Sequence, residues 1–144
     1  ACEPELLIAE ILSFIDEDTV ARRLRVADAA LLGRSSMADD AAAMERIGNG
    51  GSLGESVARA LYLFVVHQPD FKRGVLAAAN SGGDAPAVAA MTGALLGAWV
   101  GVKAIPPPLV EGLDGRMYFL MASPALFRTA QRRAGLFLQL HQRP

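Results

Sequence analysis

The segment 85–102 constrains the fold more than any other part of the chain, because its eighteen residues carry no charge. Within it, Ala89, Gly93, Gly97 and Gly101 recur at every fourth position. An α-helix has about 3.6 residues per turn, so these small residues form one smooth face against which another helix can pack. The segment is near the lower length limit for spanning a membrane, but it is rich in alanine and glycine and has no basic flank. We therefore expect a buried central helix of a bundle, and no membrane partner.

The composition favours the same class of fold. Hydrophobic residues make up 52% of the chain and aromatic residues only 6%, and isoleucine and threonine are sparse. Such a composition favours helices packed on small side chains over a sheet. A chain of 144 residues is also long enough to bury a sizeable core. We predict one all-α domain over residues 1–144.

The net charge bears on possible partners, and the cysteine content bears on location. The net charge is −1, from fourteen basic and fifteen acidic residues, so no overall field would gather nucleic acid. Cys2 is the single cysteine and cannot form an internal disulfide, and no signal sequence is recognisable, which together favour a cytoplasmic location. The chain begins without methionine, so we expect a trimmed product or a fragment of a larger domain.

Apolar residues recur at helical spacing in several further segments. These segments are 3–14, 20–32, 36–47, 53–67, 71–79 and 116–140. His67 lies at the end of one of them, where an imidazole usually caps carbonyl groups, and no second histidine or cysteine lies at metal-ligand spacing. We assign no catalytic residue.

A first glycine-rich loop joins two of the predicted helices. It reads Gly48-Asn49-Gly50-Gly51-Ser52 and leads directly into the segment 53–67. Glycines that adopt positive φ expose backbone amides, and a helix N-terminus behind them attracts anions. The same composition is also common in purely structural turns, and no Gly-Lys-Ser/Thr follows as in a nucleotide-binding P-loop. Both interpretations, an anion site and a turn, remain open.

A second glycine-rich loop, Asn80-Ser81-Gly82-Gly83-Asp84, precedes the uncharged segment. It places the carboxylate of Asp84 at the mouth of a predicted helix, which is a suitable position for contacting a metal ion or a phosphate group. The next residues, Ala85, Pro86 and Ala87, carry no ligand atoms. The loop therefore has the shape of a metal site with few of its donors.

Several motifs occur together in one order along the chain. They are Ile47-Gly48-Asn49-Gly50-Gly51-Ser52, Glu55-Ser56-Val57, Ala60-Leu61-Tyr62, Phe71, Asn80-Ser81-Gly82-Gly83-Asp84 and Ala104-Ile105-Pro106. This order resembles the C-terminal half of the ADP-ribosylglycohydrolase family over residues 28–113. The resemblance implies an orthogonal multi-helix bundle. It also implies removal of ADP-ribose from modified proteins, or hydrolysis of related ADP-ribose compounds, with two magnesium ions.

The resemblance further implies that this chain lacks some of the family's metal ligands. In the family the Gly-Gly-Asp turn continues Thr-Asp-Thr, so that two aspartates and a hydroxyl reach the metals. Here Asp84 is the one matching ligand, Pro86 stands at the second aspartate and Ala87 at the hydroxyl. The family's Thr-Asp-Asp metal segment belongs to an N-terminal half that we expect to lie outside this chain. By resemblance, Asp84 is the candidate metal ligand, and the candidate ligand-binding residues are Gly48, Asn49, Gly50, Gly51, Ser52, Asn80, Gly82 and Gly83.

Three hypotheses follow. The favoured one is a non-catalytic family member that binds ADP-ribose, an ADP-ribosylated protein or phosphate, or serves as a structural module. The second is a magnesium-dependent hydrolase completed by a missing N-terminal half or a partner chain. The third is a self-associating helical homo-oligomer without a ligand, since half of a fold leaves an apolar face to cover.

Overall fold

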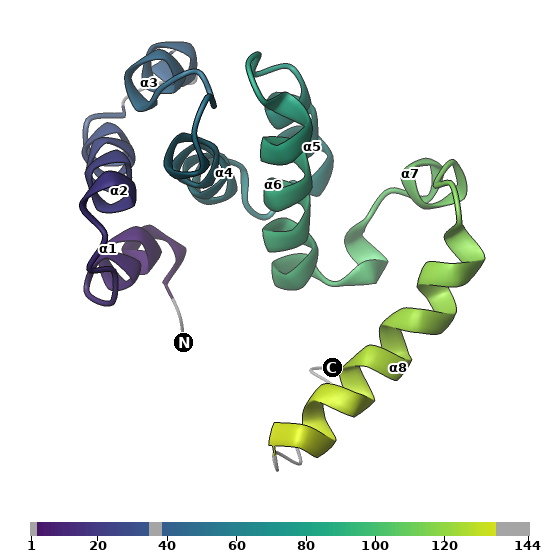
Figure 1. The fold of residues 1–144 in the computed structure, drawn as a ribbon. Helices are drawn as coiled ribbons and strands as arrows, with labels where there is room; N and C mark the ends of the chain where they lie inside the picture. The colour runs from purple at the N-terminus through teal and green to yellow at the C-terminus, as the bar shows by residue number, and fades with distance from the viewer. Residues whose placement is uncertain (1–2, 35–38, 135–144) are drawn as a thin grey trace. The chain divides into compact units, whose positions relative to one another are not determined.

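The chain is helical throughout the residues that the structure, a computed structural model, describes, which are 3–34 and 39–134 (Figure 1). In chain order the elements are η1 (Pro4–Leu6), α1 (Leu7–Leu12), α2 (Asp18–Leu32), α3 (Asp39–Ile47), α4 (Leu53–His67), α5 (Phe71–Ala79), α6 (Ala85–Val100), η2 (Val102–Ala104), α7 (Pro107–Glu111) and α8 (Arg116–Ala134). No strand occurs in these ranges, which confirms the all-α prediction. None of the described helices is both long and apolar enough to cross a bilayer.

The chain divides into two compact units, Ala1–Pro106 and Pro107–Pro144. In the first unit α4 is the central helix, with α2 and α3 on one side and α5 and α6 on the other (Figure 1). Most of α4 is buried, including Leu61, Tyr62 and Leu63. The helix begins at a Ser52 cap, whose hydroxyl accepts a hydrogen bond from the Glu55 amide at 3.3 Å.

The helices α5 and α6 pack closely through the glycine face expected from the sequence. A Cβ atom on Gly93 would lie 3.5 Å from Val75, and one on Gly97 would lie 3.7 Å from Phe71. Gly74 contributes from the α5 side, where a Cβ would come within 2.4 Å of Leu96. A Cβ atom would thus fit at ordinary contact distance on Gly93 and Gly97, whereas on Gly74 it would require the Leu96 side chain to shift.

The position of α6 differs in one respect from the expected buried central helix. Val88, Thr92 and Leu96 are buried, whereas Ala90, Ala94 and Ala98 on the remaining surface are exposed. The physical reason is that α4 and α5 cover one side of α6, and α4 takes the central place. The helix ends at Val100, two residues short of the expected Val102, because Gly101 with φ of 75° follows it as the C-cap.

The second unit consists of α7 and α8. Gly115, with φ of 70°, precedes α8, and Pro124 lies inside that helix. The part of the expected helix beyond Ala134 lies outside the described residues, as do Cys2, Ser36 and His141. The single-domain expectation for 1–144 stays a prediction.

Candidate functional site

The two glycine loops are in direct contact, although they are separate in the sequence. A Cβ atom on Gly83, which has φ of 59°, would lie 1.6 Å from the carbonyl oxygen of Asn49. A Cβ atom on Gly50, which has φ of 75°, would lie 3.1 Å from the amide nitrogen of Asp84. Only glycine permits this backbone approach at these φ values. We call residues 48–52 the first loop, residues 80–84 the second loop, and their contact the loop junction.

Arg59 of α4 lies beneath the loop junction and is 1% exposed. Its guanidinium donates hydrogen bonds to the carbonyl oxygens of Ser81 and Gly82, the second at 3.4 Å from Nη1. Its Nη1 atom would also lie 3.2 Å from a Cβ atom on Gly50. Burial lowers the pKa of Arg59, and the nearby Glu55 carboxylate opposes that shift. Because an arginine side chain stays protonated in proteins, Arg59 is a fixed cation that anchors the second loop.

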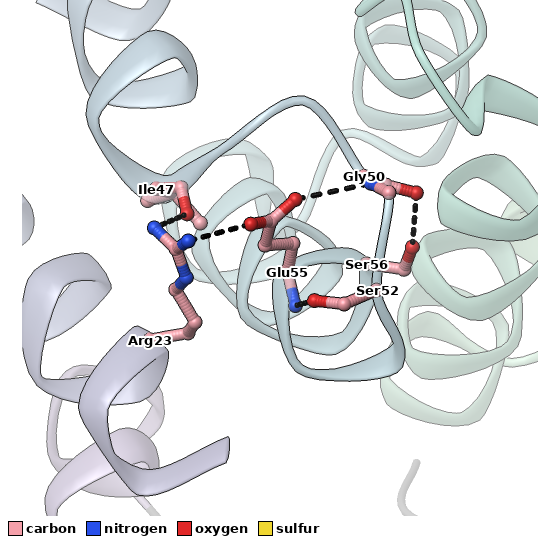
Figure 2. Close-up of polar contacts among 7 residues, drawn as sticks. Arg23, Ile47, Gly50, Ser52, Glu55 and Ser56 are labelled. Atoms are coloured by element: carbon pink, nitrogen blue, oxygen red, sulfur yellow. Dashed lines mark hydrogen bonds and ion pairs between the residues drawn. The ribbon is translucent and has the colours of Figure 1, made fainter. Parts of the chain in front are cut away.

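The side chains of Glu55 and Arg23 close the first loop (Figure 2). Glu55 accepts a hydrogen bond from the Gly51 amide at 3.0 Å through Oε2, and its Oε1 pairs with Nη2 of Arg23 at 2.6 Å. Nη1 of Arg23 also donates to the carbonyl of Ile47 at 3.0 Å. A Cβ on Gly48 would lie 2.5 Å from Cδ of Glu55, so the carboxylate fills the loop. The place that an anion would take in this loop thus already contains a carboxylate from the chain.

The second loop is open by comparison. Gly82 is exposed, and a Cβ atom on it would meet nothing within 4 Å. Asp84 is also exposed, and it lies at the N-cap of α6 without a side-chain cap hydrogen bond. Its Oδ2 accepts a hydrogen bond from the Ser56 hydroxyl at 3.4 Å. Asp84 therefore presents a carboxylate that a ligand can reach.

A cavity of about 540 Å³ lies at the loop junction and is lined by residues of both loops. It is formed by Gly50, Gly51, Ser52, Leu53, Ser56, Asp84, Ala87, Ala90 and Met91. Four of the nine candidate residues from the sequence meet here: Gly50, Gly51, Ser52 and Asp84. Gly48, Asn49 and Asn80 line a different cavity, between α3, α4 and α5, while Gly82 and Gly83 form the turn of the second loop.

Two polar side chains of the site were not assigned from the sequence, Ser56 and Arg59. Ser56 donates its hydroxyl towards both Gly50 and Asp84, each at 3.4 Å, and so belongs to both sides of the cavity. For Arg59 a signal was present, because it is the one charged residue in the otherwise apolar run 57–66. A charge in such a position requires buried hydrogen-bond partners.

The donors at the junction do not match a magnesium site. Magnesium takes an octahedral shell of oxygen ligands, usually including carboxylates. Here the cavity offers one carboxylate, Asp84, with the Ser56 hydroxyl and the Gly50 carbonyl, and its wall continues with Ala87 and Ala90. Within residues 3–34 and 39–134, no group of three or more His, Cys, Asp or Glu could hold a metal ion. The described residues do not fit the metal by themselves.

Comparison with known sequences decides the family. The family model described as ADP-ribosylglycohydrolase matches residues 2–137. The chain belongs to the ADP-ribosylglycohydrolase family. This family is known for metal dependence.

The chain is also similar to a protein of Archaeoglobus fulgidus that is described as uncharacterized. The two are 31% identical over 135 residues, which is 88% of this chain and 43% of the relative. The chain thus spans less than half the length of the relative it matches. No solved structure matches the chain.

Proposed function

We propose that this chain is a non-catalytic ADP-ribose-binding module of the ADP-ribosylglycohydrolase family, and that hydroxyl groups of the ligand bind at the loop junction. One observation carries the proposal. The exposed carboxylate of Asp84 and the hydroxyl of Ser56 lie together in a cavity lined by both glycine loops. An ionised carboxylate is an acceptor with two oxygens, and sugar hydroxyls are donors that suit it.

The charges at the junction favour the ribose over the phosphate groups as the portion that binds. Glu55 already accepts the Gly51 amide, which a phosphate would need. Asp84 adds a second negative charge, which repels a phosphate in the same cavity. A ribose is uncharged and meets neither obstacle. The diphosphate of ADP-ribose then lies outside the contact with Asp84.

The donor set supports the non-catalytic part of the proposal. A two-metal site activates water and stabilises the leaving oxygen only when carboxylates hold both ions. Among the residues that the structure describes, Asp84 is the one carboxylate that lines the junction cavity, and Pro86 and Ala87 supply no oxygen donors from their side chains. Pro86 is compatible with the helix start, because its missing N–H needs no partner in the first turn. The fold is thus compatible with a site that lacks the metal ligands.

Calorimetric titration of ADP-ribose into the chain tests this proposal. We expect saturable binding without magnesium, weakened at least tenfold in Asp84→Ala and only slightly in Asp16→Asn. Asp16 is a matched control because it is an exposed carboxylate of the same unit, outside the cavity. Binding that is absent without magnesium, or that is equal in both variants, would reject the proposal.

A second candidate function is a magnesium-dependent ADP-ribosyl hydrolase completed by another polypeptide segment. The observation that favours it is the exposure of Asp84 together with the 43% coverage of the relative. In this case, ADP-ribose is released from an ADP-ribosylated protein only when magnesium and a segment bearing the missing carboxylates are both added. The chain alone would release none.

Self-association as a homo-oligomer is a further proposal, supported by α8. Met117, Tyr118 and Phe119 are all at least half exposed, and large apolar groups of this kind mark contact surfaces. Light scattering over a range of concentrations tests it. A monomer at every concentration would reject it.

A further inference from the structure

The contact between the C-terminal end of α4 and α5 encloses a histidine. His67 is the last residue of α4 and is 7% exposed. A Cβ atom on Gly74 of α5 would lie 3.2 Å from the Cβ atom of His67, so α5 passes directly over this side chain. The Nε2 atom of His67 is buried and has no hydrogen-bond partner among the residues that the structure describes. Water can therefore reach this nitrogen only when the packing around it opens.

Protonation of His67 is unfavourable in this packing. A neutral imidazole carries one N–H, whereas a protonated one donates from both nitrogens. Nε2 must then carry a hydrogen for which the described residues offer no acceptor. A buried charge and an unpaired buried donor both cost free energy. The closed packing therefore favours the neutral ring.

Charged groups on several elements surround His67. The groups that act on its charge are Asp40 of α3, Arg73 and Asp70 at the start of α5, and Arg34, which follows α2; Glu45 of α3 and Arg59 of α4 line the cavity beside the ring. The helix α6 adds no charge, because residues 85–100 are uncharged. Burial is the largest influence and lowers the pKa of His67, and the two carboxylates only partly oppose it.

Both of these carboxylates already have partners. Asp40 is bonded to Arg34 and to the Tyr62 hydroxyl, each at 2.9 Å. Asp70 accepts the backbone amide of Arg73 at 3.0 Å as the cap of α5. The guanidinium groups of Arg34 and Arg73 also repel a cation at the ring. A protonated ring would therefore be more stable in water than in the closed contact.

The helix α5 is the element that can open this contact. It has nine residues, of which Gly74 and Ala78 are buried, whereas α4 is buried along most of its length. Elements with few buried side chains open locally at a lower free energy than the core does. The helix α5 also leads directly into the second loop, so its movement would be transmitted to residues 80–84.

We propose that His67 makes the contact between α4 and α5 acid-sensitive: below about pH 6 the ring takes up a proton by moving into water, and α5 separates from the end of α4. Because the pKa is lower in the closed state, the open state binds more protons. The closed state then loses stability as the pH falls through the ordinary value of about 6.5. The inference does not rest on the proposed function, because neither Asp84 nor ADP-ribose takes part in it.

Amide hydrogen exchange of the full chain at about pH 7 and about pH 5.5 tests the proposal. Histidines titrate in this interval, and most carboxylates titrate below it. After correction for the intrinsic effect of pH on exchange, the amides of residues 74–79 should open about three- to eightfold more often at the lower pH. The amides of α2 should not change. An unchanged α5, or an equal rise in α2, would overturn the proposal.

Two histidine variants separate the ring from other titrating groups. His67→Phe keeps a ring of similar size but cannot be protonated, so the acid response of α5 should disappear. His141→Gln changes the other histidine of the chain and should keep the full response. An acid response that persists in His67→Phe, or that is lost in His141→Gln, would contradict the role of His67.

A measurement on the ring itself decides the matter if His67→Phe does not fold. In the His141→Gln chain the single histidine signal in the NMR spectrum belongs to His67. The midpoint of its titration should lie below the ordinary value of about 6.5. A midpoint at or above that value would show that protonation costs the closed contact nothing, and the proposal would fail.

Discussion

The two glycine loops have similar composition, but a side chain of the protein fills only the first of them. In the first loop, the Glu55 carboxylate accepts the Gly51 amide and pairs with Arg23, so the loop is closed by the chain itself. In the second loop, Gly82 has open space around it and Asp84 is exposed. The first loop is therefore part of the scaffold, and the second offers the reachable group. A glycine-rich sequence before a helix indicates an anion site only if no side chain of the same protein already serves as the anion.

The largest expected effect concerns the contact between the loops. The Gly83→Ala substitution places a Cβ atom 1.6 Å from the Asn49 carbonyl, so one loop must move. We expect a loss of about 3 kcal/mol in the free energy of unfolding, typical of severe backbone clashes. Gly82→Ala is the control, because its φ of 72° is similar but its Cβ meets nothing, and about 1 kcal/mol is expected from the left-handed backbone alone. Urea unfolding of both variants measures the difference, and equal losses would show that the loops are not in contact.

The next largest effect on stability is expected for Arg59. Arg59→Met removes the donors to Ser81 and Gly82 but keeps a long apolar stem, and a loss of about 2 kcal/mol is expected from the two carbonyls left without this donor. Arg59→Lys keeps the charge but replaces the planar guanidinium with a single ammonium group, and should lose about half as much. Thermal and urea unfolding measure both losses. A methionine variant as stable as the unmodified chain would contradict the anchoring role.

The Glu55→Ala substitution tests whether the first loop can be opened. Removing the carboxylate frees the Gly51 amide and the Arg23 guanidinium, and stability should fall by about 1 kcal/mol for the lost pair and hydrogen bond. Inorganic phosphate should then stabilise the variant more than the unmodified chain, because an anion can take the vacated place. Melting temperatures with and without phosphate measure this. An equal response to phosphate in both proteins would show that the first loop is not an anion site even when opened.

The smallest effect is expected for Asp84. It has no side-chain cap bond and is exposed, so Asp84→Ala should change the free energy of unfolding by less than about 0.5 kcal/mol. Asp70→Ala is the comparison, because Asp70 caps α5 by accepting the Arg73 amide at 3.0 Å, and about 1 kcal/mol is expected there. A loss for Asp84 as large as that for Asp70 would mean that the second loop depends on its carboxylate for structure.

Local signals were sufficient to predict several helices. The segments 53–67 and 71–79 were expected and are found as α4 and α5 with the same bounds. Each begins behind a side chain that can cap it, Ser52 and Asp70, and Pro69 separates them. The N-terminal segment 3–14 is instead divided into η1 and α1, with Pro4 in the first turn of η1.

The site was less predictable because its contacts join distant parts of the chain. The two glycine loops could be recognised one at a time, but their mutual contact depends on how α4, α5 and α6 pack. The role of Glu55 depends on Arg23, which lies on another helix. The burial of Arg59 depends on carbonyl groups more than twenty positions away. No spacing within a single helix contains this information.

The guanidinium group that anchors the second loop has a further consequence for motion. If the second loop moves away, Arg59 loses its acceptors while it is still buried, which is costly for a cation. Because the backbone of Gly83 also packs against the Asn49 carbonyl of the first loop, local opening of the two loops should be a single event, not two independent ones. Amide hydrogen exchange at residues 48–52 and 80–84 should proceed at matched rates, and the Arg59→Met variant should separate them.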